Sequence, residues 1–396
     1  MTKSQNETDS QQLESQPPKD EGAVSIAHFS GMTWAHFLND GAANYLPGVL
    51  PAILVSLGEP VKVAGVLMAA LTIGQAIQPF TGWLADKIGG RILLILGLLA
   101  SSIGGALIGM ASNLLVLVFL LLLTGLGTAT FHPQALASIR AMVRSRHGFL
   151  VSAFLVGGEL GRGVWPTLAS ILSVHFGLKS LWVIAIPAMI TTPFLWRWAP
   201  KLTPRAKGAS IHWGEHLRPI TLLVAYRSAR SFATNGLVTF VPVMWFLRGG
   251  SLVAGASIIT TYIVGGTIGN LSGGNLADRI GKRPLLIASA LTGAVLFVPI
   301  VYMPGYLIWI AAAVLGFGMF LTASTTVLIG QDIFPENRAM GSGISQGLSR
   351  GMSSVLILAI GFLVSRNDVS IVFWIMAAAS LVSVLPALVL PDRFLH

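Results

Sequence analysis

Long apolar runs separated by short polar segments follow one another from residue 29 to residue 390. A helix needs about 20 mostly apolar residues to cross the hydrocarbon core of a bilayer. Each of these runs is long enough, so the pattern predicts twelve membrane-spanning helices. Their expected bounds are 29–57, 63–84, 91–111, 113–139, 149–174, 179–198, 219–247, 253–277, 284–302, 304–330, 338–364 and 369–390.

One long polar break divides these spans into two sets of six. It covers residues 199–218, and we expect it to be a cytoplasmic linker between two domains, residues 29–198 and 219–396. Residues 1–28 are polar and lack the apolar stretch of a signal peptide. We expect a disordered cytoplasmic tail there.

The composition indicates that the bilayer is the main solvent of this chain. Only 10% of the residues are charged and 54% are hydrophobic, whereas a soluble domain carries about 25% charged residues. The chain has no cysteine, which excludes disulfides, thiolate metal sites and cysteine nucleophiles. We expect no metal and no cofactor, and the absence of a Gly-x-x-x-x-Gly-Lys-Ser/Thr loop disfavours ATP as the energy source.

The net charge of +10 comes mostly from basic residues that lie between apolar runs, as they do in cytoplasmic loops. We therefore do not expect nucleic-acid binding. Of the 25 Lys and Arg residues, four lie within spans and four lie in loops on one side, which are Lys62, Lys179, Arg248 and Arg366. The other 17 lie on the opposite side, together with both termini. This bias predicts an inner-membrane protein with both termini in the cytoplasm.

Four motifs occur twice, once in each set of six spans, at separations between 188 and 195 residues. The pairs are Gly82–Arg91 with Gly274–Arg283, Asp40-Gly41 with Asn235-Gly236, Gly125–Gly127 with Gly316–Gly318, and Leu160–Gly163 with Leu348–Gly351. The repeat predicts an all-α integral membrane protein with two pseudo-symmetric six-helix bundles. Parallel repeats of this kind place a solute site between the halves near mid-membrane.

The first of these pairs, Gly-x-Leu-Ala-Asp-x-x-Gly-x-Arg, resembles the signature loop of the major facilitator superfamily. Its charged members are Asp86 and Arg91 in the first copy and Asp278 and Arg283 in the second. A salt bridge at such a hinge could hold one conformation and release in another, so we expect these four residues to act in gating. A loop that only sets topology is the alternative.

Further segments resemble the fosmidomycin-resistance family of efflux pumps within that superfamily. They are His36-Phe-Leu-Asn-Asp40, Gly127-Thr-Ala-Thr-Phe-His132-Pro133, Val156-Gly-Gly-Glu-Leu-Gly161 and Gln331-Asp-Ile-Phe-Pro-Glu336. The resemblance implies proton-coupled export of antibiotics, including a phosphonate. The chain departs from the family pattern at Gln134, where we would expect Glu, and this leaves the substrate open.

Ionisable side chains within spans are costly, by about 2.5–3.5 kcal/mol on insertion scales, and mark functional sites by default. Asp40 is the first candidate for a proton carrier because burial favours the neutral carboxyl. His132 titrates near neutrality, and Glu159 is a third candidate. The alternatives are an Asp40 held ionised by an arginine, a His132 bonded to a backbone carbonyl, and a Glu159 that only pairs with Arg162 three residues on.

Two arginines at repeat-related positions, Arg162 and Arg350, could clamp a carboxylate or a phosphonate from both halves. Alternatively, each arginine neutralises a nearby acid. The other predicted substrate contacts are His36, Asn44, Arg227, Arg230 and Gln346. Of these, Arg227 and Arg230 begin the seventh span and could instead extend to the cytoplasmic interface.

We therefore expect a monomeric secondary transporter, and not an enzyme, that works by alternating access. Its expected partners are a small-molecule substrate, protons and the lipid bilayer, with export of a small anionic drug in exchange for protons. An importer that takes up an organic anion together with protons would use the same residues. A non-transporting membrane sensor, an intramembrane enzyme and a lipid flippase are the remaining alternatives.

Overall fold

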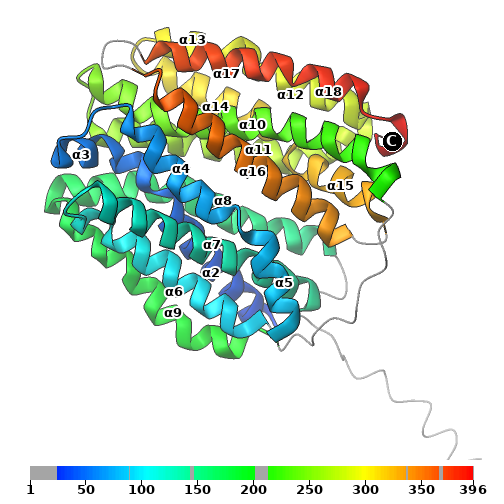
Figure 1. Ribbon diagram of the computed structural model, residues 1–396, viewed down its shortest axis with the longest axis horizontal. Helices are drawn as coiled ribbons and strands as arrows, with labels where there is room; N and C mark the ends of the chain where they lie inside the picture. Colours follow the sequence, from blue (N-terminus) through cyan, green and yellow to red (C-terminus); the bar gives the residue numbers. More distant parts are fainter. Residues whose placement is uncertain are drawn as a thin grey trace, which may run out of the picture.

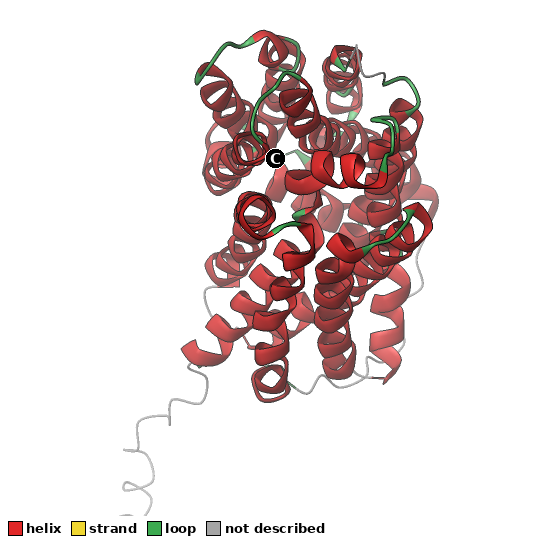
Figure 2. Ribbon diagram, turned by 90° about the vertical axis from the view of Figure 1, so that its left-hand side faces the viewer, coloured by secondary structure: helices red, strands yellow, loops and turns green. Residues whose placement is uncertain are grey.

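The computed structural model describes residues 25–88, 90–142, 147–200, 213–335, 338–364 and 369–395. These residues form helices joined by short turns, without a strand among them (Figure 2). The predicted tail up to residue 24 and the linker residues 201–212 lie outside the described residues.

The first six predicted spans are occupied by helices or by pairs of consecutive helices. In chain order these are α2 (Ile26–Asn44), α3 (Leu46–Leu57), α4 (Val63–Gln75), α5 (Gln78–Ile88), α6 (Gly90–Leu107), η1 (Ile108–Met110), α7 (Leu114–Met142), α8 (His147–Phe176), η2 (Leu178–Ile184) and α9 (Ala185–Trp198). Their order and bounds agree with the predicted spans to within a few residues at most ends.

The second set follows the same plan. Its helices are α10 (Trp213–Leu247), α11 (Leu252–Ile280), α12 (Lys282–Leu296), α13 (Pro299–Tyr302), α14 (Leu307–Phe320), α15 (Ala323–Ile333), α16 (Arg338–Gly361), α17 (Ser370–Val382), α18 (Val384–Val389) and η4 (Asp392–Phe394). The largest difference from the prediction is at α10, which begins at Trp213 and so makes the end of the expected linker helical.

Several spans are broken into two helices, and proline accompanies some of these breaks. Pro47 and Pro299 lie in the first turns of α3 and α13, and Pro79 follows the first residue of α5. Proline fixes its own φ and donates no backbone hydrogen bond, which suits the start of a new helix and not its interior. These prolines therefore lie where a new helix begins.

Eight of the described spans are long and apolar enough to cross a membrane by length and composition alone. The four others are the first, fifth, seventh and eleventh spans, formed by α2 with α3, α8, α10 and α16. Apart from His132 on α7, these four carry the intramembrane ionisable residues of the predicted sites. Polar residues lower their hydropathy, so the spans that look least like membrane helices are the candidates to face a polar interior.

The two halves lie side by side, as the blue-to-green and green-to-red parts of Figure 1 show. Inside the first half, α2 packs on α8 and α4 packs on α7; inside the second, α10 packs on α16 and α11 packs on α14. Between the halves, α8 packs on α11 and α4 packs on α16. Exchanging the first span with the seventh, the second with the eighth and so on converts each of these contacts into another, as expected for a pseudo-two-fold arrangement.

The halves approach each other most closely at the end of the molecule away from the chain termini. A Cβ atom added at Gly65 of α4 would lie 2.8 Å from the Cα atom of Gly361 on α16. Further along the interface, the hydroxyls of Thr167 on α8 and Thr260 on α11 lie 2.6 Å apart. These contacts close one end of the interface and leave the ionisable residues nearer its middle.

Candidate functional site

Asp40 lies in the second half of α2 and is the centre of a buried cluster, with only 2% of its surface exposed. Its Oδ1 atom is 2.9 Å from Nε2 of His132 on α7. Its Oδ2 atom is 3.4 Å from Nε of Arg162 on α8 and 3.6 Å from Nε2 of His36, one turn earlier on α2. The sequence predicted the stripe on α2, and the structure brings the two other helices to it.

Glycines on α8 make this approach possible. A Cβ atom at Gly158 would lie 2.4 Å from the imidazole ring of His36, and one at Gly161 would lie 2.3 Å from the backbone oxygen of Phe37. Any larger residue at these positions would push α8 away from α2. Because Arg162 follows directly on α8, the same glycines set its distance from the Asp40 carboxylate.

The contacts of His132 require a proton between its ring and Asp40. Its Nδ1 atom is 2.9 Å from the backbone oxygen of Thr128, and a carbonyl oxygen can only accept, so Nδ1 carries a hydrogen. The Nε2 atom is also at hydrogen-bond distance from a carboxylate oxygen. Either His132 is an imidazolium that donates to the Asp40 carboxylate, or neutral His132 accepts from the Asp40 carboxyl. In both cases the pair holds one proton more than a neutral histidine and an ionised aspartate.

His36 has a different role from His132. Its Nδ1 atom donates to the backbone oxygen of Phe154, 2.9 Å away, while its Nε2 atom lies beyond hydrogen-bond distance from Asp40. A neutral ring satisfies these contacts. His36 therefore forms one wall of the cluster next to the site of the shared proton.

His36, Asp40 and His132 also form a group of three possible metal ligands, whose donor atoms all lie within 4.8 Å of one another. Two ligands on one tetrahedral ion, with bonds of about 2.0–2.1 Å, lie about 3.3 Å apart. The 2.9 Å between His132 and Asp40 is shorter and matches a charge-assisted hydrogen bond. The guanidinium of Arg162 also adds a positive charge beside the carboxylate, so this arrangement fits a proton better than a divalent ion.

Two residues that the sequence-based prediction missed orient the Asp40 carboxylate. The amide of Asn39 donates to Oδ1 of Asp40 at 3.2 Å, and its own oxygen accepts from the hydroxyl of Ser101 on α6 at 2.7 Å. Asn39 stands next to Asp40 in the motif, which was a usable signal. Nothing in the local sequence of Ser101 indicates its contact with a residue of α2.

Glu159 is buried at the interface between the halves and bonds to α11. Its Oε1 atom accepts from the amide of Asn270 at 2.9 Å, and the amide oxygen of Asn270 accepts from the backbone N–H of Ser324 at 3.2 Å. Among the described residues no ion pair joins Glu159 to Arg162, which contacts Asp40 instead. The spacing suggested a pair between Glu159 and Arg162. In the structure Arg162 instead contacts Asp40 on α2, and Glu159 bonds to Asn270 on α11.

Three arginines from three helices, Arg162 on α8, Arg350 on α16 and Arg227 on α10, form a series that runs from the first half to the second. Arg350 on α16 lies within electrostatic range of both Arg162 and Asp40, and Arg227 on α10 lies within range of Arg350. Arg227 also donates to the hydroxyl of Thr326 on α15. Among the described residues we find no hydrogen-bond or ion-pair partner for the Arg350 guanidinium. The middle of the interface thus combines three arginines with Asp40, and its positive excess suits an anion.

Arg230 is separated from this group, although the sequence placed it among the substrate contacts. It is buried, and its guanidinium donates to the backbone oxygen and hydroxyl of Ser289 at 2.8 and 2.5 Å and to the backbone oxygen of Met319 at 2.7 Å. These acceptors belong to α12 and α14 within the second half. Arg230 thus bonds to helices of its own half, and its expected contact with the substrate stays a prediction.

Two further predicted contacts are polar groups near the interface. Asn44 donates to the backbone oxygen of Asp40 at 2.8 Å, so its amide is partly engaged within α2. Gln346 on α16 is partly buried, one turn before Arg350. Asn44 thus contributes to the local structure of α2, and Gln346 stays a candidate contact.

The basic residues of the repeated loop connect helices within each half. Arg91 donates to the backbone oxygen of Ala199, just after α9. Arg283 forms an ion pair of 2.7 Å with Asp392, just after α18. Each of these contacts joins the start of the third span of one half to the end of the sixth span of the same half. Neither is a salt bridge between the two halves.

The acidic residues of the loop differ in what the structure describes. Asp278 is exposed, and no partner is found for it among the described residues. The side chain of Asp86 lies outside the described part of the chain. A gating role for these residues stays a prediction.

Comparison of the chain with known protein families and proteins gives consistent matches. The chain matches the family model described as the Major Facilitator Superfamily over residues 32–358 and 231–394. It is 26% identical over 346 residues to the uncharacterized MFS-type transporter YfnC of Bacillus subtilis (strain 168), with 83% of this chain and 84% of that protein covered. It is 20% identical to the fosmidomycin resistance protein of Escherichia coli (strain K12), with 93% and 94% covered.

Solved structures of similar fold are also transporters. A crystal structure of the nucleoside transporter NupG superposes with a TM-score of 0.74 at 12% identity and covers 92% of this chain and 99% of that chain. A bacterial homolog of the human lysosomal transporter Spinster, in an inward-facing and occupied conformation, gives 0.69 at 15% identity, with 94% and 96% covered. The predicted fold of twelve helices in two six-helix bundles is confirmed.

Proposed function

Since this chain belongs to the major facilitator superfamily of membrane transporters, we propose that it moves a small organic anion across the inner membrane by a proton-coupled, alternating-access cycle. The observation that carries the proposal is the 2.9 Å contact between Nε2 of His132 and Oδ1 of Asp40, directly beside Arg162. Binding of a proton and binding of an anion would both change the charge around the same carboxylate, so the two events are coupled.

Arg162, Arg350 and Arg227 support the anionic character of the substrate. They come from α8, α16 and α10, so a solute held by all three contacts both halves. A guanidinium offers a planar fork of donors that matches a carboxylate or a phosphonate. A ligand bridging the halves would favour the conformation in which they are close, as alternating access requires.

Export in exchange for protons is the first candidate direction. Two similar proteins carry names that refer to resistance, the fosmidomycin resistance protein and the multidrug resistance protein MdtG, the latter 27% identical over 298 residues. We therefore propose a phosphonate or another small acidic antibiotic as the exported compound. The cytoplasmic position of both termini and a monomeric carrier belong to the same proposal.

Uptake together with protons is the second candidate, because the contact of Asp40 with Arg162 favours it. A proton on Asp40 removes the charge that attracts Arg162, and this leaves the guanidinium free for an anion. Proton and anion would then bind together, as in symport. Antiport instead requires that each weakens the binding of the other, and therefore a change in the position of Arg162 between the two states.

Substrate affinity measured against pH decides between the two directions. A resistance panel in a pump-deficient host, with phosphonates and lipophilic cations, first identifies a transported compound. Its affinity for the purified protein should fall with decreasing pH for an antiporter and rise for a symporter. The sign is then checked by proton flux in everted vesicles, where substrate-induced loss of lumenal protons supports antiport. If neither the substrate affinity nor the proton flux depends on pH, proton coupling is contradicted.

A further inference from the structure

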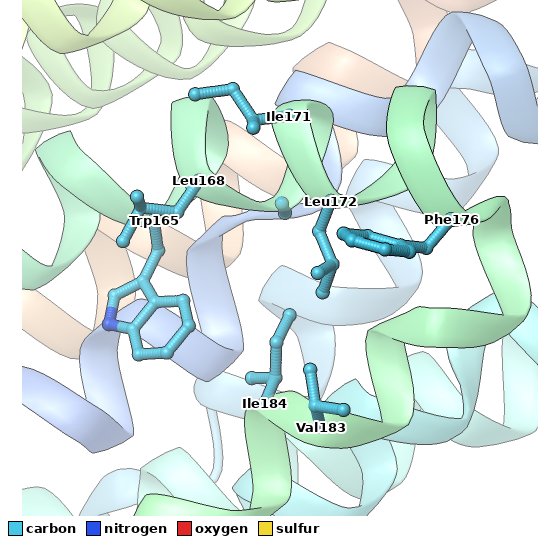
Figure 3. A pocket seen from close by; sticks show the side chains of 8 residues that line it. Trp165, Leu168, Ile171, Leu172, Phe176, Val183 and Ile184 are labelled. Atoms are coloured by element: carbon cyan, nitrogen blue, oxygen red, sulfur yellow. The ribbon is translucent and has the colours of Figure 1, made fainter.

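An apolar cavity of about 300 Å³ lies between α8 and η2, outside the polar cluster. Leu168, Leu172 and Phe176 line it from α8, and Val183 and Ile184 line it from η2. Figure 3 shows these side chains converging from the two elements, with the indole of Trp165 at one end. Every side chain that lines the cavity is apolar apart from the indole N–H of Trp165, so the cavity suits an apolar occupant.

The cavity opens toward the side of the bundle. Leu168, Ile171 and Phe176 on its rim are 45, 39 and 75% exposed. In a membrane-spanning chain the medium next to such side chains is the acyl region of the bilayer. A hydrocarbon chain that enters the cavity would touch protein on several sides and gain dispersion contacts that an empty space lacks.

Two basic residues lie at the corner where the two lining elements meet. Helix α8 ends at Phe176, and Gly177, with φ of 79°, reverses the chain into η2. His175 and Lys179 flank this corner, and both are exposed. Lys179 lies three residues after the lining residue Phe176 and four before Val183. An exposed lysine this close along the chain to the lining residues matches an amphiphile with an anionic head and a hydrocarbon tail.

We propose that this site binds an anionic phospholipid of the surrounding bilayer, with an acyl chain in the cavity and its phosphate at Lys179. A lysine near a membrane surface attracts an anionic lipid by about 1 kcal/mol, or about fivefold in affinity. The acyl chain supplies the rest through burial of apolar surface. The proposal concerns a lipid site and does not depend on the direction of transport.

The inner wall of the cavity connects this site to the polar cluster. The indole of Trp165 packs on α2 so closely that a Cβ atom at Gly41 would lie 1.6 Å from its Cδ1 atom. Gly41 is the neighbour of Asp40, and Trp165 lies three residues after Arg162 on α8. A chain in the cavity would hold Trp165 against α2 and so stabilise the distance between α2 and α8.

The test uses full-length protein in nanodiscs that contain a phosphatidylglycerol with brominated acyl chains. Bromine quenches nearby tryptophan fluorescence, and the difference between the native protein and Trp165→Phe isolates the contribution of Trp165. We expect this contribution to be quenched, and Leu172→Phe, which fills the cavity, to abolish most of the quenching. The matched control Leu115→Phe changes a side chain on α7 that is 81% exposed and should leave the quenching unchanged.

A second measurement tests the head group independently of packing. Lys179→Gln should lower the preference for brominated phosphatidylglycerol over brominated phosphatidylcholine by about fivefold. Lys62→Gln, at the other exposed lysine of this end, should not. Both lysine side chains are exposed, so this measurement tests the proposal even if Leu172→Phe fails to fold. Any of three results would overturn the proposal. The first is that Trp165 is not quenched, and the second is that the two lysine variants have equal effects. The third is that a transported solute, and not plain phospholipid, displaces the brominated chain.

Discussion

The first and second halves of this transporter use the same pair of helices for different chemistry. In the first half, Asp40 on α2 contacts Arg162 on α8. In the second, the repeat-related Asn235 on α10 donates to the hydroxyl of Ser353 on α16 at 3.0 Å. The scaffold is duplicated, but an ion pair in one half corresponds to a neutral hydrogen bond in the other.

The difference extends to the neighbouring positions. At the same repeat offsets, the second half has Ser231 for His36, Ala323 for His132 and Gly347 for Glu159. In the other direction, Arg227 and Arg230 of the second half correspond to Met32 and Ala35 of the first. Arg162 in the first half corresponds to Arg350 in the second, so an arginine occupies this position in both halves. Titratable groups are thus concentrated in the first half and additional cations in the second. We infer that the first half handles the proton and that both halves hold the anion.

The largest effect is expected when the first half is made to resemble the second. Asp40→Asn should reduce transport driven by a pH gradient by at least about a hundredfold, because the amide cannot share a proton with His132 and leaves Arg162 unpaired. Solute exchange without a gradient should persist in the same proteoliposomes. Glu59→Gln, in the loop between α3 and α4, is the matched control. Full gradient-driven transport by Asp40→Asn would remove Asp40 from the mechanism.

A contrast between two arginines of the second half tests where the anion binds. Arg350→Gln should raise KM for an anionic solute by about tenfold to a hundredfold, since a hydrogen bond to a charged group contributes about 1.5–3 kcal/mol. Arg230→Gln should leave KM nearly unchanged but destabilise the protein by about 3 kcal/mol, because it loses buried bonds to Ser289 and Met319. Flux assays and thermal unfolding separate the two outcomes. Equal changes in KM would place both arginines at the solute.

His132→Gln tests the proton itself. Glutamine can donate to Asp40 but does not titrate between pH 5 and 8, so solute affinity should lose most of its pH dependence over that range. Affinity at the pH where the native protein binds best should change by only about threefold to fivefold, because the hydrogen bond is kept. His28→Gln, at a half-buried position near the start of α2, serves as the control. An unchanged pH profile would assign the proton to another group.

The smallest effect is expected at Glu159. Glu159→Gln keeps an oxygen that can accept from Asn270 and removes only the charge, so the transport rate should change by about twofold to threefold. Glu159→Ala breaks the contact between α8 and α11 and should have the larger effect on rate. A loss of coupling in Glu159→Gln as severe as in Asp40→Asn would show that the proton site extends across the interface.

The sequence by itself determined the twelve spans, the repeat and the stripe of polar residues on α2. The length of apolar runs and the helical spacing follow directly from the order of residues. In a bilayer an unpaired backbone polar group is costly, so a spanning segment of this kind must be helical. The same reasoning identified Asp40, His132 and Arg162 as unusual, because ionisable groups at that depth have a high insertion cost. The family was also indicated by local motifs.

Only the tertiary structure decided which of these groups meet. Spacing says which residues share a face of one helix, but partners on other helices depend on rotation and on close approach at glycines such as Gly158. That is why Arg162 contacts Asp40 and not Glu159, and why Arg230 bonds within the second half. The apolar cavity beside Trp165 likewise exists only because α8 and η2 fold back on each other, since no pattern along the chain specifies an empty volume between two elements.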